Sequence, residues 1–235
     1  MGRFPNIAAA KAATGAKKGK LYGMYAKEIY QVAKNGGTTP EGNPSLKRLI
    51  EKAREDQVPN DIIKRAIDKV NSGIDENYQV VRYELFGPSG STFIVECLTD
   101  NVNRSVSSVR AVLNKTSVKM GNQGSVTFNY DHNAVIGVQG ASEDEILEKL
   151  VDAGIDVSDI EPEGETIVVY GDPTALYDIK EALSSFNVVA SEIAWVPKEL
   201  IKITDEDKET VKKLLTLLDE IDDVQNVYHN IESVD

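Results

Sequence analysis

The chain has 235 residues, with 26 Lys and Arg against 38 Asp and Glu, one Cys and two His. At roughly 100–200 residues per domain, this length suits one large domain or two to three small ones. The lone Cys97 excludes an intramolecular disulfide and a multi-cysteine zinc site. No stretch approaches the roughly 20 apolar residues that a membrane span needs. We therefore expect a cytoplasmic protein without membrane contact.

The net charge of −12 is distributed very unevenly along the sequence. Residues 1–73 carry 14 basic and 7 acidic side chains, whereas residues 131–235 carry 7 and 26. The first 27 residues contain six cations and no acid, and residues 101–130 contain four cations and no acid. Clustered cations without acids are typical of surfaces that bind a phosphate backbone, and an acidic region elsewhere repels it. This polarity predicts a nucleic-acid partner.

The first third of the sequence predicts a basic arm followed by a helical bundle. The arm covers residues 1–20, and the bundle covers residues 21–75 with three short amphipathic helices. Asn43 is the expected N-cap of the second helix with Pro44 in its first position, and Pro59 opens the third. A mitochondrial transit peptide is the less favoured interpretation of the arm, because arginine is nearly absent there.

From residue 76 onward the pattern changes to alternating strands and helices. A hairpin is predicted around Gly87-Pro88-Ser89-Gly90, then a helix over residues 103–115 and a strand near residues 125–129. Further strands are expected at 134–138, 166–170, 188–195 and 224–230, with helices beginning after Ser142, Asp172 and Thr204.

This order predicts a multidomain α+β protein. Besides the three-helix bundle, we expect two small α+β domains, each an antiparallel sheet with helices on one face. The middle domain comprises residues 76–130 plus 199–235, and residues 131–198 form an acidic domain inserted into it.

No sequence motif for catalysis, metal binding or cofactor binding is present. The chain has no Walker loop, no Rossmann glycine fingerprint and no GxSxG elbow. Strand alternation places Cys97 in a core, His132 falls in a predicted turn, and Trp195 is expected mainly in a core. The many carboxylates of the last third fit helix starts and loops rather than an EF-hand. We therefore expect a non-enzyme with no cofactor, no metal and no small-molecule substrate.

Several blocks of the sequence resemble the YebC family. They are Gly2-Arg3 with Asn6-Ile7, Lys17-Lys18-Gly19-Lys20, Asn43-Pro44-Ser45-Leu46, the run from Val58 to Ile67, Leu98 to Arg104, Gly124-Ser125-Val126 and Ala194 to Pro197. The resemblance extends over essentially the whole chain. Gly2-Arg3-Phe4-Pro5 stands where the family usually has Gly-His-Ser-Lys-Trp, which is more similar to the YeeN-type subgroup.

The resemblance implies a three-lobed fold in which one α+β domain is inserted into another. It also implies a cytoplasmic regulator without catalytic residues, named as a probable DNA-binding transcriptional regulator. Relatives that include a mitochondrial translational activator act on the ribosome. By position, it places the arm, Asn103-Arg104 and the loop from Met120 to Gly124 against RNA or DNA.

Our leading hypothesis is a non-enzymatic, ribosome-associated translation factor that contacts rRNA and tRNA through its arm and bundle. The alternatives are a transcription regulator on duplex DNA and an acidic scaffold for a basic protein partner. The expected nucleic-acid-binding residues come from the arm, the outer faces of the bundle and the acid-free window. They are Arg3, Lys11, Lys17, Lys18, Lys20, Lys27, Lys47, Arg48, Lys64, Arg65, Asn103, Arg104, Arg110, Lys119 and Met120.

Overall fold

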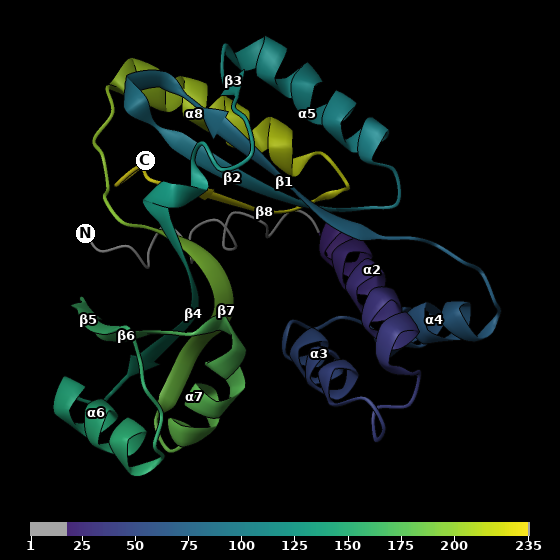
Figure 1. Cartoon of the computed structure of the whole chain (residues 1–235), viewed down its shortest axis with the longest axis vertical. Coiled ribbons are helices and arrows are strands. Elements are labelled where there is room, and N and C mark those ends of the chain that lie inside the picture. The colour runs from purple at the N-terminus through teal and green to yellow at the C-terminus, as the bar shows by residue number, and fades with distance from the viewer. Residues whose placement is uncertain (1–17, 235) are drawn as a thin grey trace.

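The computed structural model describes residues 18–234, so Arg3, Lys11 and Lys17 of the predicted interface lie outside the described residues. The described chain forms seven α-helices and two four-stranded antiparallel sheets arranged in three lobes (Figure 1). The predicted α+β class is confirmed. Among the described helices, none has the length and apolar character needed to cross a membrane.

The helical lobe, residues 18–73, contains α2 (Lys18–Gly36), α3 (Pro44–Glu55) and α4 (Asn60–Asn71). Its core is apolar, with Ile29 and Leu46 fully buried between the helices. Asn43 caps α3 as predicted, because its side-chain oxygen accepts the Leu46 amide at 3.1 Å. The same side chain donates to the Val32 carbonyl at 3.0 Å, which ties the end of α2 to the start of α3.

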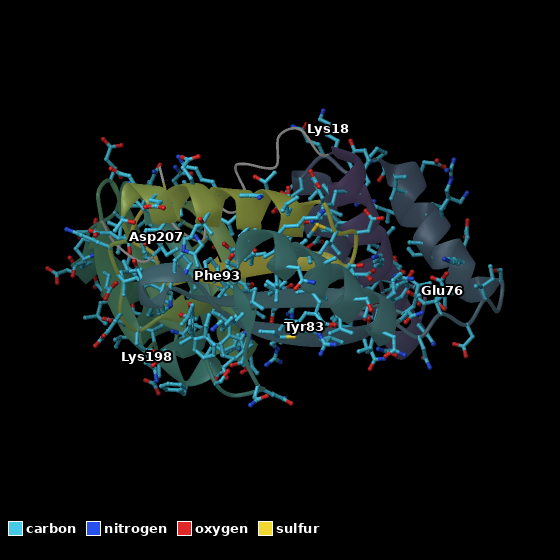
Figure 2. The ribbon with its side chains drawn as sticks, turned by 90° about the horizontal axis from the view of Figure 1, so that it is seen from above. Lys18, Glu76, Tyr83, Phe93, Lys198 and Asp207 are labelled. Atoms are coloured by element: carbon cyan, nitrogen blue, oxygen red, sulfur yellow. The ribbon has the colours of Figure 1, made fainter. Side chains whose placement is uncertain are left out.

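The first sheet has the strand order β3-β1-β2-β8. Its strands are β1 (Gln79–Phe86), β2 (Thr92–Thr99), β3 (Lys119–Met120) and β8 (Val224–His229). The helices α5 (Val102–Thr116) and α8 (Asp205–Asp219) cover one face (Figure 1). Tyr83 and Phe93, both labelled in Figure 2, belong to the buried cluster between the sheet and these helices. Cys97 belongs to the same buried cluster, as its strand alternation predicts.

The second sheet, order β5-β6-β4-β7, belongs to the acidic lobe, which we define as residues 130–197. Its strands are β4 (Tyr130–Gln139), β5 (Asp159–Glu163), β6 (Thr166–Gly171) and β7 (Asn187–Pro197). The helices α6 (Glu143–Asp152) and α7 (Leu176–Ala182) pack on one face through Ile146 and Ile179.

Two local predictions in this region are wrong, and one strand was not predicted. The strand expected near residues 125–129 is a loop with a short 3-10 helix at Thr127–Asn129, and the strand starts at Tyr130. His132 therefore lies in β4 rather than in a turn. The edge strand β5 was not predicted, because its residues are largely polar, although β6 follows it after only Gly164 and Glu165.

The two sheets share a hydrophobic cluster on the faces that their helices leave uncovered. Ile94 and Tyr228 of the first sheet pack there with Tyr130 and Val196 of the acidic lobe. The Tyr130 hydroxyl and the Thr92 side-chain oxygen lie 2.9 Å apart across this contact. A continuous apolar core holds the two sheets in one arrangement. We propose the domain bounds 76–130 plus 199–235 and 131–198, which agree with sheet membership to within one residue, because the second sheet extends over residues 130–197.

Candidate nucleic-acid interface

Three of the predicted cations lie together where the start of α2 meets the end of α8. The Lys20 ammonium lies 3.0 Å from the Asp219 carboxylate, and the Lys27 ammonium lies 3.0 Å from that of Asp223. Arg104, at the start of α5, also contacts Asp223 at 3.0 Å. These front cations are therefore paired with acids of the C-terminal third. The pairs join residues up to 199 positions apart, which no local sequence pattern can reveal.

Asp223 is the centre of this contact. Its side chain is only 5% exposed and accepts hydrogen bonds from Lys27, Arg104 and Thr99. Burial alone would raise the pKa of this carboxyl, but the Lys27 and Arg104 hydrogen bonds outweigh burial and lower the pKa below its ordinary value. The cluster docks the helical lobe onto the first sheet.

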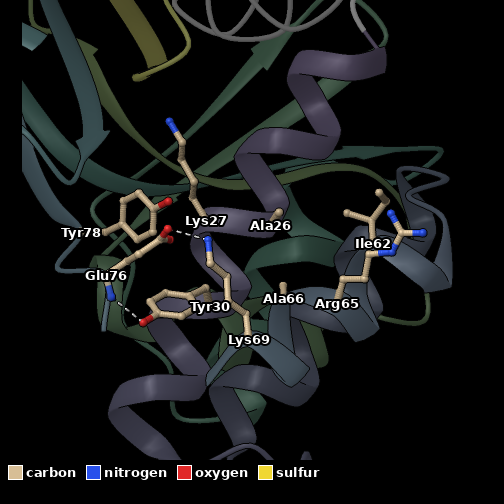
Figure 3. A pocket seen from close by; sticks show the side chains of 9 residues that line it. All are labelled: Ala26, Lys27, Tyr30, Ile62, Arg65, Ala66, Lys69, Glu76 and Tyr78. Carbon is tan, nitrogen blue, oxygen red and sulfur yellow. Dashed lines mark hydrogen bonds and ion pairs between the residues drawn. The ribbon is translucent and has the colours of Figure 1, made fainter. Parts of the chain in front are cut away.

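A pocket of about 220 Å³ lies at the same junction, between α2, α4 and the segment that leads into β1 (Figure 3). The rings of Tyr30 and Tyr78 meet edge to face at 5.7 Å. Lys69 pairs with Glu76 at 2.6 Å, and the Tyr30 hydroxyl accepts the Glu76 amide at 2.8 Å. These contacts use the polar groups of the pocket to fix the linker, so the pocket acts as a joint between lobes.

The outer faces of α3 and α4 carry the predicted cations of the helical lobe. Lys47 and Lys64 are exposed and form no ion pair with any residue that the structure describes. Arg65 pairs with Asp61 at 2.6 Å, with both side chains largely in solvent. Arg48 lies 4.2 Å from the centre of the Tyr177 ring of α7, so it bridges the helical and acidic lobes.

The remaining predicted residues lie along α5 and β3, on the first sheet. Asn103 and Arg110 are exposed on α5, and Lys119 is exposed in β3, where Met120 is half-buried. These side chains do not gather with those of α3 and α4. The structure thus divides the predicted residues into the paired cluster around Asp219 and Asp223, the α3 and α4 faces, and the α5 edge, with Lys18 exposed at the first position of α2.

A buried carboxylate, which was not predicted from the sequence, accepts hydrogen bonds from the backbone of the loop after Met120. Glu84 of β1 is 4% exposed and accepts backbone hydrogen bonds from Gly124, Val126 and Thr127. Burial raises the pKa of Glu84, but the three amide donors outweigh it, so the pKa lies below its ordinary value. The loop therefore has a fixed shape, with Asn122 and Gln123 exposed at its tip.

The acidic lobe carries 2 basic and 15 acidic side chains, a balance of −13. Within residues 18–234, no group of its carboxylates is arranged so that it could hold a metal ion. Cys97 and His229, whose side chains could act as a nucleophile or a general base, are buried in hydrophobic cores. Burial raises the pKa of the Cys97 thiol to about 11 and lowers that of His229 to about 4. A nucleophile or general base at neutral pH needs the opposite shifts or solvent access.

The described geometry defines a three-lobed α+β protein with a basic helical lobe and a separate acidic lobe. Residues 2–73 match the TACO1/YebC protein N-terminal domain, and residues 78–231 match the TACO1/YebC second and third domain. The chain belongs to the TACO1/YebC family.

Three relatives that align over nearly the whole chain share one functional description. A protein of Alteromonas mediterranea named "Probable transcriptional regulatory protein" is 45% identical and covers 98% of both chains. Proteins with the same description from Vibrio cholerae and Acholeplasma laidlawii are 45% and 44% identical, covering 99% of each chain. The crystal structure of a conserved hypothetical protein from Aquifex aeolicus matches with a TM-score of 0.78 and 35% identity, covering 93% of this chain and 92% of that one.

Proposed function

We propose that this protein is a non-enzymatic regulator of gene expression that binds rRNA and tRNA on the ribosome. The observation that carries the proposal is the separation of charge in the fold. Lys47 on α3 and Lys64 on α4 are exposed and free of ion pairs among the described residues, whereas the separate acidic lobe has a balance of −13. Such a molecule approaches a phosphate surface with one lobe first.

RNA suits the distribution of these cations. They lie on two helices of a small bundle and on α5, and they do not follow a single helix that would enter a major groove. RNA is recognised largely through shape and backbone contacts, which dispersed cations can supply. In the proposed mechanism, Lys47, Lys64 and Arg110 contact phosphates. The carboxylates of the acidic lobe are repelled by these phosphates and make no contact with the RNA. The arm cations Arg3, Lys11 and Lys17 are proposed to add further contacts.

Regulation of transcription on duplex DNA is the second candidate, and the names of the relatives favour it. In this case α4 is the candidate recognition helix, because it carries Lys64 and Arg65 on its outer face. The same face also exposes Asp61 and Asp68, which would oppose the phosphates of a groove.

Crosslinking the protein to nucleic acid in cells and sequencing the attached fragments tests both candidates. We expect fragments of rRNA and tRNA, enriched relative to a variant in which Lys47 and Lys64 are replaced by Gln. Enrichment of one promoter sequence without rRNA would contradict the ribosomal proposal and support the regulator of transcription. Recovery of neither class above the background of the variant would contradict both.

A further inference from the structure

A ladder of three side chains crosses the junction between the two sheets. The rings of His132 and Trp195 stack with their centres 4.5 Å apart and their planes inclined by 23°. The guanidinium of Arg82 lies 5.1 Å from the centre of the Trp195 ring. His132 and Trp195 are direct partners in the β4–β7 pairing, whereas Arg82 comes from β1 of the other sheet. The ladder exists only because the two sheets pack together.

The indole of Trp195 is held rigidly in this position. Its Nε1 donates to the Glu96 carboxylate at 3.0 Å, and the same carboxylate lies 3.5 Å from Arg82. Partial desolvation lowers the pKa of His132, which favours the uncharged form of its imidazole. A rigid aromatic pair beside a cation has the composition of the stacking platforms that hold unpaired nucleobases.

The ladder is open to solvent, unlike an ordinary core contact. His132 is exposed, and the Arg82 side chain is 46% exposed. Two apolar neighbours are exposed as well, namely Ile193 at 41% and Val80 at 60%. Strand alternation puts Val80 on the same face of β1 as Arg82, opposite the face that packs against α5 and α8.

The same face of β1 leads toward a second aromatic residue. Tyr78 precedes β1 and lies four positions before Arg82, which corresponds to about 13 Å at the usual rise of a strand. Lys27 lies 6.0 Å from the centre of the Tyr78 ring, so the second ring also has a cation beside it (Figure 3). Two aromatic positions at this separation are too far apart for one small molecule to stack on both, whereas an extended strand can place a base at each.

We propose that the His132–Trp195–Arg82 ladder is a stacking site for unpaired bases of single-stranded RNA. The inference rests on the proposed function, because it names the part of an RNA that this surface would take. Base stacking is tolerant of sequence, since every base has an aromatic face. The site would thus add affinity for unpaired RNA without requiring a particular sequence. Duplex RNA or DNA would bind only through the cations of the helical lobe.

Trp195 is the single tryptophan of the chain, so its emission reports on this site directly. The full-length protein is titrated with a labelled 12-nucleotide oligouridylate, and both Trp195 emission and the anisotropy of the label are followed. We expect the emission to change with the same midpoint as the anisotropy. A DNA duplex of equal length is expected to bind without the emission change, because its bases are already stacked.

Matched variants separate the ladder from general charge. His132→Ala is expected to weaken oligouridylate binding by about five- to a hundredfold, the usual range for loss of one stacking side chain. Val151→Ala, which truncates a residue that is 66% exposed on α6, is the control and should leave affinity unchanged. Arg82→Gln should weaken binding more than Lys212→Gln, which removes an exposed cation from α8.

The possible results distinguish this inference from the proposed function. If the oligonucleotide binds by anisotropy while Trp195 emission is constant and His132→Ala binds as tightly as Val151→Ala, the ladder is only a structural contact and the inference is overturned. RNA binding through the helical lobe would then still stand. If no RNA binds even at low salt, both the inference and the proposed function are overturned.

Discussion

Replacement of Asp223 by Asn should destabilise the protein strongly, although it changes only one atom of the side chain. The carboxylate is 5% exposed and accepts from Lys27, Arg104 and Thr99, each at 3.0 Å. Loss of one partner of a buried ion pair costs about 3–5 kcal/mol, because the other charge stays buried. Here Lys27 is 18% exposed and Arg104 is 52% exposed, so solvent compensates in part. We expect a loss of about 2–3 kcal/mol, at or below the lower limit of that range.

Urea denaturation followed by circular dichroism measures this loss as a lower midpoint with an unchanged slope. Asp222→Asn is the matched control. Asp222 is exposed, and Lys27 contacts only its backbone carbonyl at 2.9 Å, a bond that the substitution preserves. The control should therefore stay within about 0.5 kcal/mol of the parent protein. If Asp223→Asn is equally mild, the cluster does not hold the helical lobe in place, and the reasoning on the paired cations is wrong.

Three further predictions follow from the buried groups. Glu84→Gln should cost about 2 kcal/mol in the same urea assay, because a neutral amide oxygen replaces a carboxylate that accepts three backbone amides; an unchanged midpoint would contradict this role. Glu84 and Asp223 both have lowered pKa values in the folded protein, so their contribution is complete above their unfolded pKa of about 4 and disappears as the pH falls through the folded values. The free energy of unfolding should decrease below about pH 4, and it should decrease less in the Glu84→Gln/Asp223→Asn double variant; parallel pH profiles would show that other groups control acid unfolding. The Cys97 thiol, with its pKa raised to about 11 and its side chain buried, should react with a thiol reagent at pH 8 only when urea unfolds the chain; rapid reaction of the native protein would contradict its burial.

Local signals in the sequence predicted most of the helices and strands. Asn43 and Ser142 were predicted as caps, and both accept the expected backbone amides, because a cap depends only on residues within one turn. The alternation of apolar residues along β2 was sufficient to predict that Cys97 is buried. The edge strand β5 was not predicted, since Glu161 and Glu163 suggest a solvated loop until β6 pairs with them.

Long-range contacts decided what the sequence could not reveal about the candidate site. Residue composition places Lys20 and Lys27 in a basic, acid-free segment, but their partners Asp219 and Asp223 lie almost 200 residues away. His132 and Trp195 each have an unremarkable local pattern, and they form a ladder with Arg82 only where two lobes meet. That Lys47, Lys64 and Arg110 bind nucleic acid remains a prediction.

The dependence of RNA affinity on salt tests the central claim most directly. Each phosphate contact contributes about 0.7 to 0.9 to the slope of log affinity against log salt concentration. If Lys47 and Lys64 contact phosphates of tRNA, their joint replacement by Gln should reduce that slope by about 1.4 to 1.8. Replacing Lys202 and Lys212, two exposed cations outside the helical lobe, should leave it unchanged. Equal slopes for both double variants and the parent protein would contradict the claim that the helical lobe binds the phosphate backbone.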